Sequence, residues 1–267
     1  MPFQQPDSIR YFTFDIFSNC RVTHAIFTRR GGVSPEPWDS LNVGATVGDE
    51  LERVIKNRTR SFNGLDRDHK SIFDVWQVHG SEVICADAPR KTRTPIRKAD
   101  AILTDQPQVT LFMRFADCVP VFLYDPVHAV VGIVHAGWPG TIKRAAGLAV
   151  ETMRNKYGTK PVDILAAIGP SIGPHHYQVG PEVVEQVIKA FGEDAQSLLQ
   201  QSLNYSPDKK QFDLWKANQL ILEQTGVRHI EISSICTACN IGDWYSHRGE
   251  NGRTGRFGAL FALSSSG

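Results

Sequence analysis

The sequence predicts a mixed α/β fold of the α+β type, in one domain that spans residues 1–267. Three observations lead to this prediction. Segments with strand character outnumber segments with helical periodicity by about two to one. Adjacent strand segments are close enough in the chain to pair as hairpins, whereas a regular alternation of strand and helix would predict a parallel sheet. No internal repeat, low-complexity tract or long linker divides the chain.

Four segments carry apolar residues at helical spacing, together with start or stop signals. Asp49 and Thr141 are the expected caps of the first two helices, and Gly158 ends the second. Pro181 occupies the first turn of the third helix, and the fourth follows Asp213. In chain order, the apolar stripes are Leu51, Val54, Ile55 and Phe62; Ile142, Ala145, Ala146, Ala149, Val150 and Met153; Val183, Val184, Val187, Ile188 and Phe191; and Leu214, Ala217 and Ile221.

Short runs rich in β-branched and aromatic residues lie between the helices and are typical of strands. Adjacent members of this set are expected to pair. The runs are His24–Thr28, Val83–Ala86, Ala101–Leu103, Val109–Arg114, Val119–Tyr124, Val130–His135, Ile164–Ile168, Ile230–Ile232 and Phe257–Leu263.

The composition is that of an ordinary globular protein, with 41% hydrophobic and 21% charged residues. A formal net charge of +1 provides no field for bulk binding of nucleic acid or an anionic membrane, so we expect small-molecule partners. No apolar stretch reaches the roughly 18 residues that a membrane span requires, and residues 1–12 do not resemble a secretory signal. Five cysteines, an odd and sparse set, indicate reduced thiols and hence a soluble protein of the cytoplasm.

Three residues stand apart from the other histidines and cysteines because of their surroundings. His79 ends a short apolar run in the segment Trp76–Gly80. Cys118 lies between two apolar strands, and His135 ends the run that begins at Val130 and is followed by a glycine-rich turn. All three lie where a strand gives way to a turn, which is where a rigid sheet usually displays reacting groups.

If the three side chains meet, their chemistry is constrained. Two imidazoles and one thiolate leave a fourth tetrahedral position open, as catalytic zinc requires, and the same ligands also suit copper. The turn after His135 is expected to start a helix whose N-terminus favours an anionic group such as phosphate. The alternative interpretations are a core histidine at this position and a small buried side chain at Cys118.

Short motifs in a fixed order extend over nearly the whole chain. They are TRRGGVS (Thr28–Ser34), SLNVGATVGDE (Ser40–Glu50), KNR (Lys56–Arg58), QVHG (Gln77–Gly80), ADAILTDQP (Ala99–Pro107), ADCVPV (Ala116–Val121), VHAGWPGT (Val134–Thr141), IGPSIGPHHYQVG (Ile168–Gly180), DLWKANQ (Asp213–Gln219), CT (Cys236–Thr237) and YSHRGENGRTGR (Tyr245–Arg256). By these motifs the sequence resembles the YfiH-like, laccase-domain family of bacterial purine nucleoside enzymes, whose members were first described as polyphenol oxidases.

The resemblance implies a four-layered α/β sandwich, in which mixed β-sheets are flanked by helices. It implies that His79, Cys118 and His135 are both the catalytic residues and the ligands of a metal, usually zinc. The implied reactions are phosphorolysis of adenosine, inosine and methylthioadenosine, and deamination of adenosine, so the implied partners are nucleosides and phosphate. By motif position, the residues expected to approach the substrate are Arg29, Asn42 and Arg248.

Three departures from the family pattern bear on this interpretation. Pro139 stands where the family commonly has an arginine, which weakens the case for a phosphate contact there. In the IGP loop, Ser171, His175 and His176 replace cysteines, and the two histidines are interpreted as an exposed loop pair or as substitutes in the same pocket. The late SYRR-type motif of the family appears here as Ser246-His247-Arg248-Gly249, which keeps only one of its two arginines.

Other functions stay open at this stage. A nucleophilic Cys118 activated by His135 would make a metal-free hydrolase or amidase, for which peptidoglycan precursors are a credible substrate class. A single copper on the three ligands would support weak phenol oxidation, although the sequence lacks the His-x-His elements of multicopper oxidases. Cys236 and Cys239 form a C-x-x-C pair without the second pair of a zinc ribbon, so we expect Cys236 to line or underlie the pocket.

Two aspartates are candidates for supporting roles. Asp117 directly precedes Cys118, and Asp100 lies in the ADAILTDQP motif; either is a candidate for the general acid. Asp117 is equally a candidate for the carboxylate that orients a ligand imidazole. The sequence does not specify the preferred nucleoside, the native metal or the oligomeric state.

Overall fold

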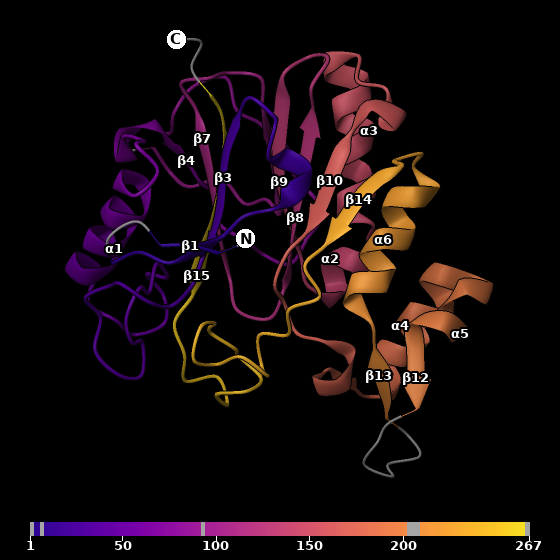
Figure 1. Ribbon diagram of the computed structural model, residues 1–267. Coiled ribbons are helices and arrows are strands. Elements are labelled where there is room, and N and C mark those ends of the chain that lie inside the picture. Colours follow the sequence, from indigo (N-terminus) through magenta and orange to yellow (C-terminus); the bar gives the residue numbers. More distant parts are fainter. Residues whose placement is uncertain (1–2, 6–7, 92–93, 202–208, 265–267) are drawn as a thin grey trace.

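The computed structural model describes residues 3–5, 8–91, 94–201 and 209–264, which form a layered sandwich of β-sheets flanked by helices. Two six-stranded mixed sheets lie face to face, and helices cover their outer sides (Figure 1). A third, three-stranded sheet lies beside the lower end of this sandwich (Figure 1). The predicted fold class is therefore confirmed.

All the predicted strand segments are present, with ends shifted by no more than two residues. The strands that the sequence did not indicate are two or three residues long, too short to show alternation.

The first sheet has the order β1 (Phe3–Gln4), β2 (Tyr11–Phe12), β3 (Val22–Phe27), β15 (Phe257–Leu263), β7 (Thr110–Phe115) and β4 (Ile72–Phe73). The second has the order β14 (His229–Ile232), β10 (Leu165–Ile168), β8 (Val119–Asp125), β9 (Val130–Ala136), β6 (Ala101–Thr104) and β5 (Val83–Cys85), and the small sheet has the order β11 (Gln178–Val179), β13 (Lys210–Phe212) and β12 (Leu199–Gln201).

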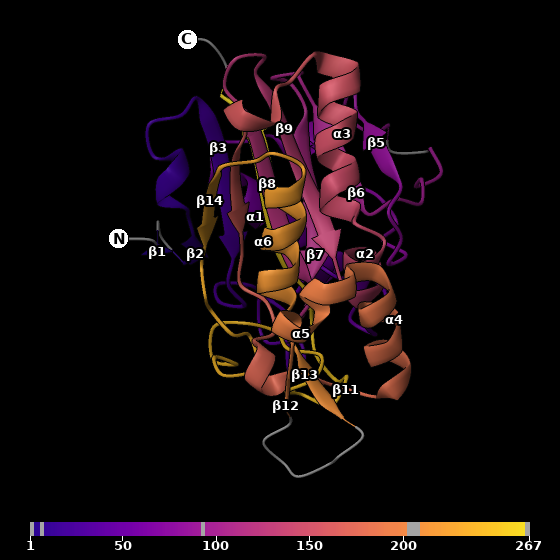
Figure 2. The ribbon, with the colours of Figure 1, turned by 90° about the vertical axis from the view of Figure 1, so that its right-hand side faces the viewer.

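The helices form the two outer layers. One helix, α1 (Leu51–Asn63), lies outside the first sheet (Figure 1). Two helices, α3 (Ala145–Tyr157) and α6 (Leu214–Gln224), lie side by side over the second sheet (Figure 2). The remaining helices α2 (Trp138–Ile142), α4 (Pro181–Phe191) and α5 (Ala195–Leu198) gather near the small sheet (Figure 2).

Three apolar cores separate these layers, because strand side chains alternate between the two faces of each sheet. In β3, Ile26 belongs to the core between the sheets, whereas Phe27 joins Phe62 of α1 in the outer core. In β8, Phe122 faces the core between the sheets, whereas Val121 belongs to the core beneath α3 and α6. Both central sheets are thus covered on each side, which gives four layers.

The predicted first helix is present, but its apolar stripe was partly wrong. Val54 and Phe62 are buried, whereas Leu51 and Ile55 are 61% and 48% exposed, because α1 contacts the sheet along one narrow face. The helix begins after Glu50 rather than with Asp49 as its cap. The Asp49 carboxylate instead accepts hydrogen bonds within the preceding loop.

The predicted second helix is divided in two. Arg144 has a left-handed backbone, with a φ of 58°, and this residue interrupts the helix between α2 and α3. Thr141 therefore lies inside α2 and is not a cap, while Gly158 ends α3 as predicted. At α6, the Asp213 side chain caps the helix by accepting a hydrogen bond from Lys216 N at 3.0 Å.

The third predicted helix is present as α4, which begins at Pro181. Val187 and Phe191 of its stripe are buried, but Ile188 is 52% exposed.

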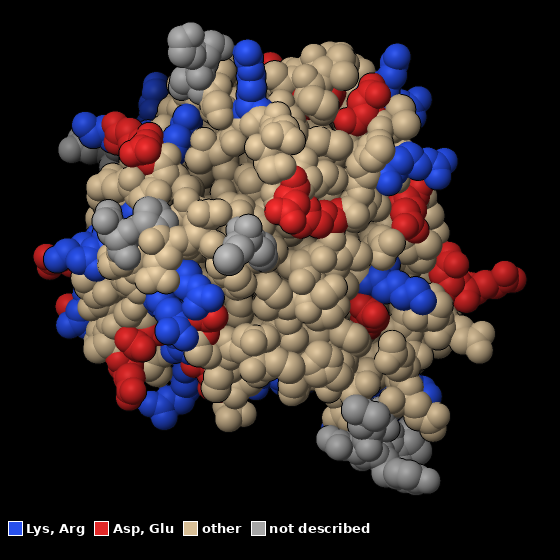
Figure 3. Space-filling view, in the orientation of Figure 1, with Lys and Arg blue, Asp and Glu red and all other residues tan. Residues whose placement is uncertain are grey.

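Acidic and basic side chains are interspersed over the face of the molecule shown in Figure 3, without a field of one sign. No helix among the described residues is long and apolar enough to cross a membrane.

Candidate active site and metal centre

One edge of the second sheet brings the three predicted ligands together. Cys118 directly precedes β8, and His135 lies near the end of β9. Because β8 and β9 are antiparallel, with Pro120 opposite His135, the start of one strand and the end of the other lie at the same edge. The register therefore places the Cys118 thiol beside the His135 ring.

The third ligand reaches this edge through a parallel pair of strands. His79 lies in the segment before β5, and Asp100 directly precedes β6. Because β5 and β6 are parallel, and β6 pairs with β9, the starts of β5 and β6 also lie at the edge where β9 ends. The backbone N–H of His135 donates to the Asp100 carbonyl at 2.7 Å, which ties the two segments together.

The ligand atoms of His79, Cys118 and His135 all lie within 4.8 Å of one another. Cys118 Sγ is 3.7 Å from His79 Nε2, and the two imidazole rings are 4.9 Å apart between centroids. Tetrahedral zinc with bond lengths of about 2.3 Å to sulfur and about 2.0 Å to nitrogen would separate these ligand atoms by about 3.6 Å. The three side chains therefore fit a metal of this size.

Asp100 holds the two histidines in position. Its buried carboxylate accepts hydrogen bonds from His135 Nδ1 at 2.8 Å, from His79 N at 3.0 Å and from Gly80 N at 2.6 Å. A fourth, from Val78 N, is 3.2 Å long. Because Nδ1 of His135 is bound to a carboxylate, Nε2 is the atom available to a metal, an arrangement common behind metal-ligating histidines.

Asp117 has a different role from the one that the sequence suggested. Its carboxylate accepts hydrogen bonds from Thr237 Oγ1 and Ser246 Oγ, both at 2.7 Å, and from Arg248 N at 2.6 Å. It therefore joins the Cys118 turn to the C-terminal segment, and Asp100 orients the ligand imidazole in its place. Both carboxylates are committed to holding the site together, so we assign them positioning roles rather than acid catalysis.

The cluster depends on unusual backbone positions. His79 and Asp117 have left-handed backbone conformations, with φ values of 56° and 80°, which residues other than glycine rarely adopt. Gly137 leaves the space that the cluster occupies, since a Cβ at this position would lie 2.9 Å from both Cys118 Sγ and His79 Cδ2. The helix that follows, α2, begins at Trp138 and contains only five residues.

The electrostatics of the cluster favour a thiolate. Burial alone would raise the pKa of Cys118, but the charge and hydrogen bonds of the two histidines outweigh burial and lower this pKa to about 6. Burial alone would lower the pKa of His135, but the Cys118 charge and the Asp100 carboxylate raise it to about 9. Since the thiolate is the form of cysteine that binds metals and attacks electrophiles, the side chain is prepared for either role.

A cavity of about 640 Å³ opens over the cluster, within the range typical of small-molecule sites. Its walls combine aromatic and apolar side chains with arginines. Beyond the three cluster residues, the principal lining side chains are Leu51, Arg58, Trp76, Gln77, Ile96, Arg114, Asp117, Trp138, Ile172, Tyr177, Leu214, His247, Arg248 and Arg256.

Comparisons with known proteins identify the family of this chain. Residues 23–264 match the family described as multi-copper polyphenol oxidoreductase laccase. The purine nucleoside phosphorylase YlmD of Bacillus subtilis is 35% identical over 254 residues, which cover 92% of this chain and 90% of that protein. The chain belongs to the YfiH/YlmD family. The purine nucleoside phosphorylase YfiH of Escherichia coli is 32% identical over 88% of this chain and 91% of its own length.

A solved structure of the family has the same fold. The crystal structure of YlmD from Geobacillus stearothermophilus superposes with a TM-score of 0.91 and 32% identity, and the match covers 99% of each chain. A purine nucleoside phosphorylase from Deinococcus radiodurans is 36% identical over 92% of this chain and 90% of its own length. The shared fold extends over nearly the whole sandwich.

Of the three residues predicted to approach the substrate, Arg248 lines the cavity of this YfiH-family chain. Its guanidinium lies over the Tyr177 ring, 5.2 Å from the centroid, and donates to the Gln178 carbonyl at 2.9 Å. Asn42 is buried and does not line the cavity. Its amide instead holds the Gly44 and Arg256 backbones, accepting from both N–H groups at 2.9 Å.

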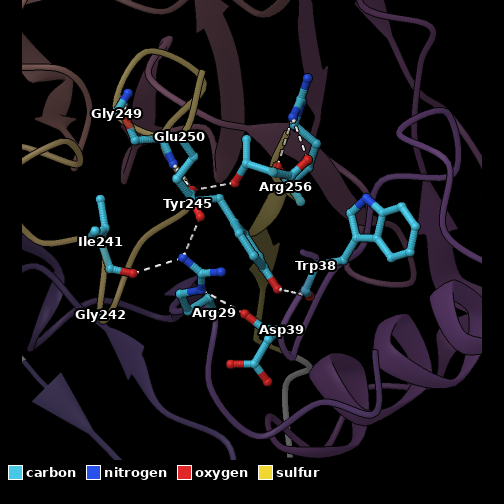
Figure 4. Close-up of polar contacts among 12 residues, drawn as sticks. Arg29, Trp38, Asp39, Ile241, Gly242, Tyr245, Gly249, Glu250 and Arg256 are labelled. Carbon is cyan, nitrogen blue, oxygen red and sulfur yellow. Dashed lines mark hydrogen bonds and ion pairs between the residues drawn. The ribbon is translucent and has the colours of Figure 1, made fainter. Parts of the chain in front are cut away.

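Arg29 does not line this cavity, and Figure 4 shows its guanidinium among Asp39, Ile241 and Tyr245. Its guanidinium donates to the Asp39 carbonyl at 2.6 Å and forms an ion pair with Glu250 at 2.9 Å. It also lies over the Tyr245 ring, 4.5 Å from the centroid. These contacts place Arg29 at a second cavity, beside Glu36 and Glu250, where it ties the N-terminal loops to the C-terminal segment.

Sequence reasoning missed several lining residues. Arg58 and Arg256 belong to the KNR and YSHRGENGRTGR motifs, so motif membership alone was a signal for them. Arg58 and Arg114 share the buried Asp74 with Arg90, at 3.8, 3.2 and 2.5 Å, so one carboxylate offsets only part of the charge of these arginines. Arg256 donates through Nη1 to two backbone carbonyls, at 3.3 and 2.8 Å, and neither bond uses Nε or the second amino group.

Proposed function

We propose that the protein is a metal-dependent purine nucleoside phosphorylase that also deaminates adenosine. The expected substrates are adenosine, inosine and methylthioadenosine, with phosphate as the second reactant. The observation that carries this proposal is the convergence of His79, Cys118 and His135 at the base of a cavity in a chain of the YfiH/YlmD family. Relatives that match almost end to end are named purine nucleoside phosphorylases.

The three cluster residues would hold the metal. Zinc is the metal that two imidazoles and one thiolate suit best, with copper as the alternative. When bound with an open position, such a metal acts as a Lewis acid and lowers the pKa of a bound water to roughly 7. His135 is oriented for this role by Asp100, and Gly137 keeps the approach to Cys118 and His79 clear.

For phosphorolysis, phosphate must lie against the face of the ribose where positive charge develops at C1′. We assign the phosphate contact to Arg248 and Arg256, which line the cavity. A guanidinium suits this role because it donates two parallel hydrogen bonds to an oxyanion. These two side chains supply the positive charge that the family places after Trp138, where this chain has Pro139.

The purine base would lie against the apolar part of the cavity. Trp138 and Tyr177 provide aromatic surfaces, and Ile172 and Leu214 complete an apolar wall. A planar base gains from stacking and from removal of apolar surface from water. Ribose and phosphate would then be directed toward the metal ligands and the two arginines.

The direct test is an assay of purified, metal-replete protein with adenosine, with and without phosphate. Phosphate-dependent adenine identifies phosphorolysis, and phosphate-independent inosine identifies deamination. Arg256→Lys, which keeps the charge but removes the planar fork, is expected to raise the KM for phosphate about tenfold while the rate of deamination stays unchanged. Absence of turnover of any purine nucleoside would contradict the proposal.

A second candidate function rests on the thiolate–imidazolium pair. Cys118 beside His135 has the arrangement of a nucleophilic cysteine and its base, which supports a metal-free hydrolase or amidase acting on peptidoglycan precursors. A chelator separates the two functions, since it would abolish metal-dependent turnover and leave a cysteine hydrolase active. Alkylation of Cys118 would abolish both.

Polyphenol oxidation is the least supported function. The described part of the chain holds two groups of His and Cys side chains that could bind a metal, and the cluster in the cavity offers three ligands to a single ion. Metal analysis of protein purified without added copper tests polyphenol oxidation.

The five cysteines are all free, which agrees with the reducing cytoplasm that we propose as the compartment.

A further inference from the structure

A second cluster of histidines and cysteines lies beside the cavity. It consists of His175 and His176 in a short 3-10 helix, η4 (Pro174–His176), and of Cys236 and Cys239 in the turn after β14. All four ligand atoms lie within 4.8 Å of one another. We propose that these four side chains form a second metal site, which binds zinc as a structural ion.

The sheet topology explains why two distant segments meet. The η4 segment follows β10 and the cysteine turn follows β14, and these two strands are parallel neighbours. Because parallel strands end at the same edge, both loops leave the sheet together. A bridge between Ser171 and Cys236 continues the pairing beyond the strands, and Thr237 N donates to the Ser171 carbonyl at 3.0 Å. The C-x-x-C pair therefore finds its partner pair in the two histidines.

The distances fit a tetrahedral ion. His176 Nδ1 lies 3.6 Å from Cys236 Sγ and 3.5 Å from Cys239 Sγ, against about 3.6 Å for nitrogen and sulfur on tetrahedral zinc. His175 Nε2 lies 3.0 Å from Cys239 Sγ, so this pair must separate by about half an ångström to admit the ion. Two sulfurs and two nitrogens form the ligand set typical of zinc.

The surroundings support the ligands on one side and leave them accessible on the other. Gly173 N donates to Cys236 Sγ at 3.2 Å, a bond that holds the sulfur in place. Gly173 also leaves room for the His175 ring, since a Cβ there would lie 2.7 Å from His175 Cε1. Cys236 is buried, whereas His175, His176 and Cys239 are exposed, so an ion can enter from solvent. Two thiolates balance the charge of a divalent ion.

The four-ligand set indicates a structural role. Four protein ligands close the coordination of zinc, whereas a catalytic ion keeps a position for water or substrate. Tyr177, which follows His176, lines the cavity, and Thr237, which follows Cys236, donates at 2.7 Å to Asp117, another lining residue. An ion at this point would fix the two loops relative to the Cys118 turn.

Metal stoichiometry tests the proposal directly. We expect full-length protein from zinc-supplemented culture to contain about two zinc ions per chain after it is desalted over a chelating resin. Elemental mass spectrometry measures this ratio. Cys236→Ser/Cys239→Ser and His79→Ala/Cys118→Ser are each expected to contain about one, through loss of different sites. The matched control is Cys20→Ser/Cys85→Ser, which removes two free thiols outside both clusters and should still contain about two.

A spectroscopic measurement keeps the test valid if Cys236→Ser/Cys239→Ser fails to fold. Cobalt added to metal-free His79→Ala/Cys118→Ser is expected to give the visible bands of a tetrahedral ion and the near-ultraviolet band of a thiolate ligand. Zinc should also raise the Tm of this variant by several degrees. The proposal is overturned if this variant binds no zinc or cobalt, or if Cys236→Ser/Cys239→Ser retains two zinc ions per chain.

Discussion

The two His/Cys clusters lie at the same edge of the second sheet but differ in ligand number and support. The first offers three ligands at the base of a cavity, and a buried carboxylate fixes His135 from behind. The second offers four ligands on exposed loops, and backbone contacts such as that from Gly173 provide much of its support. The difference shows how one sheet edge can support two kinds of metal site. Three ligands leave a metal position open for reaction, whereas four ligands close the coordination, so that the ion can only hold loops together.

The largest expected effect comes from removing the thiolate of the open cluster. Cys118→Ser is expected to lower kcat/KM for adenosine phosphorolysis by about 10³-fold, because the ligand set loses its anionic member. Steady-state assays at saturating phosphate measure this effect, with Cys85→Ser as the control. The comparison would break if folded Cys236→Ser/Cys239→Ser lost as much activity, since the second cluster would then take part in the reaction.

The support behind the open cluster gives the next effect. Asp100→Asn is expected to weaken metal binding at the first site by about 10- to 100-fold, because His135 loses the carboxylate that orients it and raises its basicity. Competition with a fluorescent chelator measures the affinity. Asp87→Asn is the control, since the Asp87 side chain is 79% exposed. Equal weakening of both zinc sites would show that Asp100 acts through general stability.

Two glycines provide a matched pair of smaller changes. Gly137→Ala places a methyl group against Cys118 and His79, and Gly173→Ala places one against His175 and Cys236. Each is expected to weaken metal binding about tenfold at its own cluster only, and only Gly137→Ala should lower activity by a similar factor. Gly180→Ala is the control, because its Cβ would meet nothing within 4 Å. Loss of both ions in either variant would argue that the clusters are one coupled site.

His24, which lies outside both clusters, is expected to make the free energy of unfolding depend on pH without affecting activity at neutral pH. Burial lowers the pKa of His24 from 6.5 to about 4, and its Nε2 accepts a hydrogen bond from Phe14 N at 2.8 Å. The unfolded chain therefore takes up this proton first as the pH falls. The stabilisation is complete above about pH 6.5 and is lost toward pH 4, by at most about 3 kcal/mol.

Denaturant unfolding of metal-free protein at pH 7.5 and 4.5 measures this loss. His24→Gln cannot titrate, so its free energy of unfolding should fall less than that of the unaltered chain over the same interval. Metal-free protein is required because protonation of the cluster ligands also releases metal. An equal fall in both proteins would assign the pH dependence to other groups.

The sequence predicted the local elements well, because helical and strand periodicities are local properties. Its errors lie where tertiary contacts decide which face is buried: Leu51 and Ile188 continue apolar stripes but remain exposed. Arg29 shows the same limit at the candidate site. Its motif predicts a substrate contact, but only the structure shows that its guanidinium pairs with Glu250, more than two hundred residues away. No local pattern contains that information.

The sequence by itself determined the strand and helix segments, the family, and the His79, Cys118 and His135 set that the structure brings together. Only the tertiary structure decided that Asp100, rather than Asp117, orients His135, and that the histidine pair of one loop faces the cysteine pair of another. The physical reason is that strand direction and register determine which chain ends share an edge of the sheet. Both follow from pairing between strands far apart in the chain, which one-dimensional spacing does not specify.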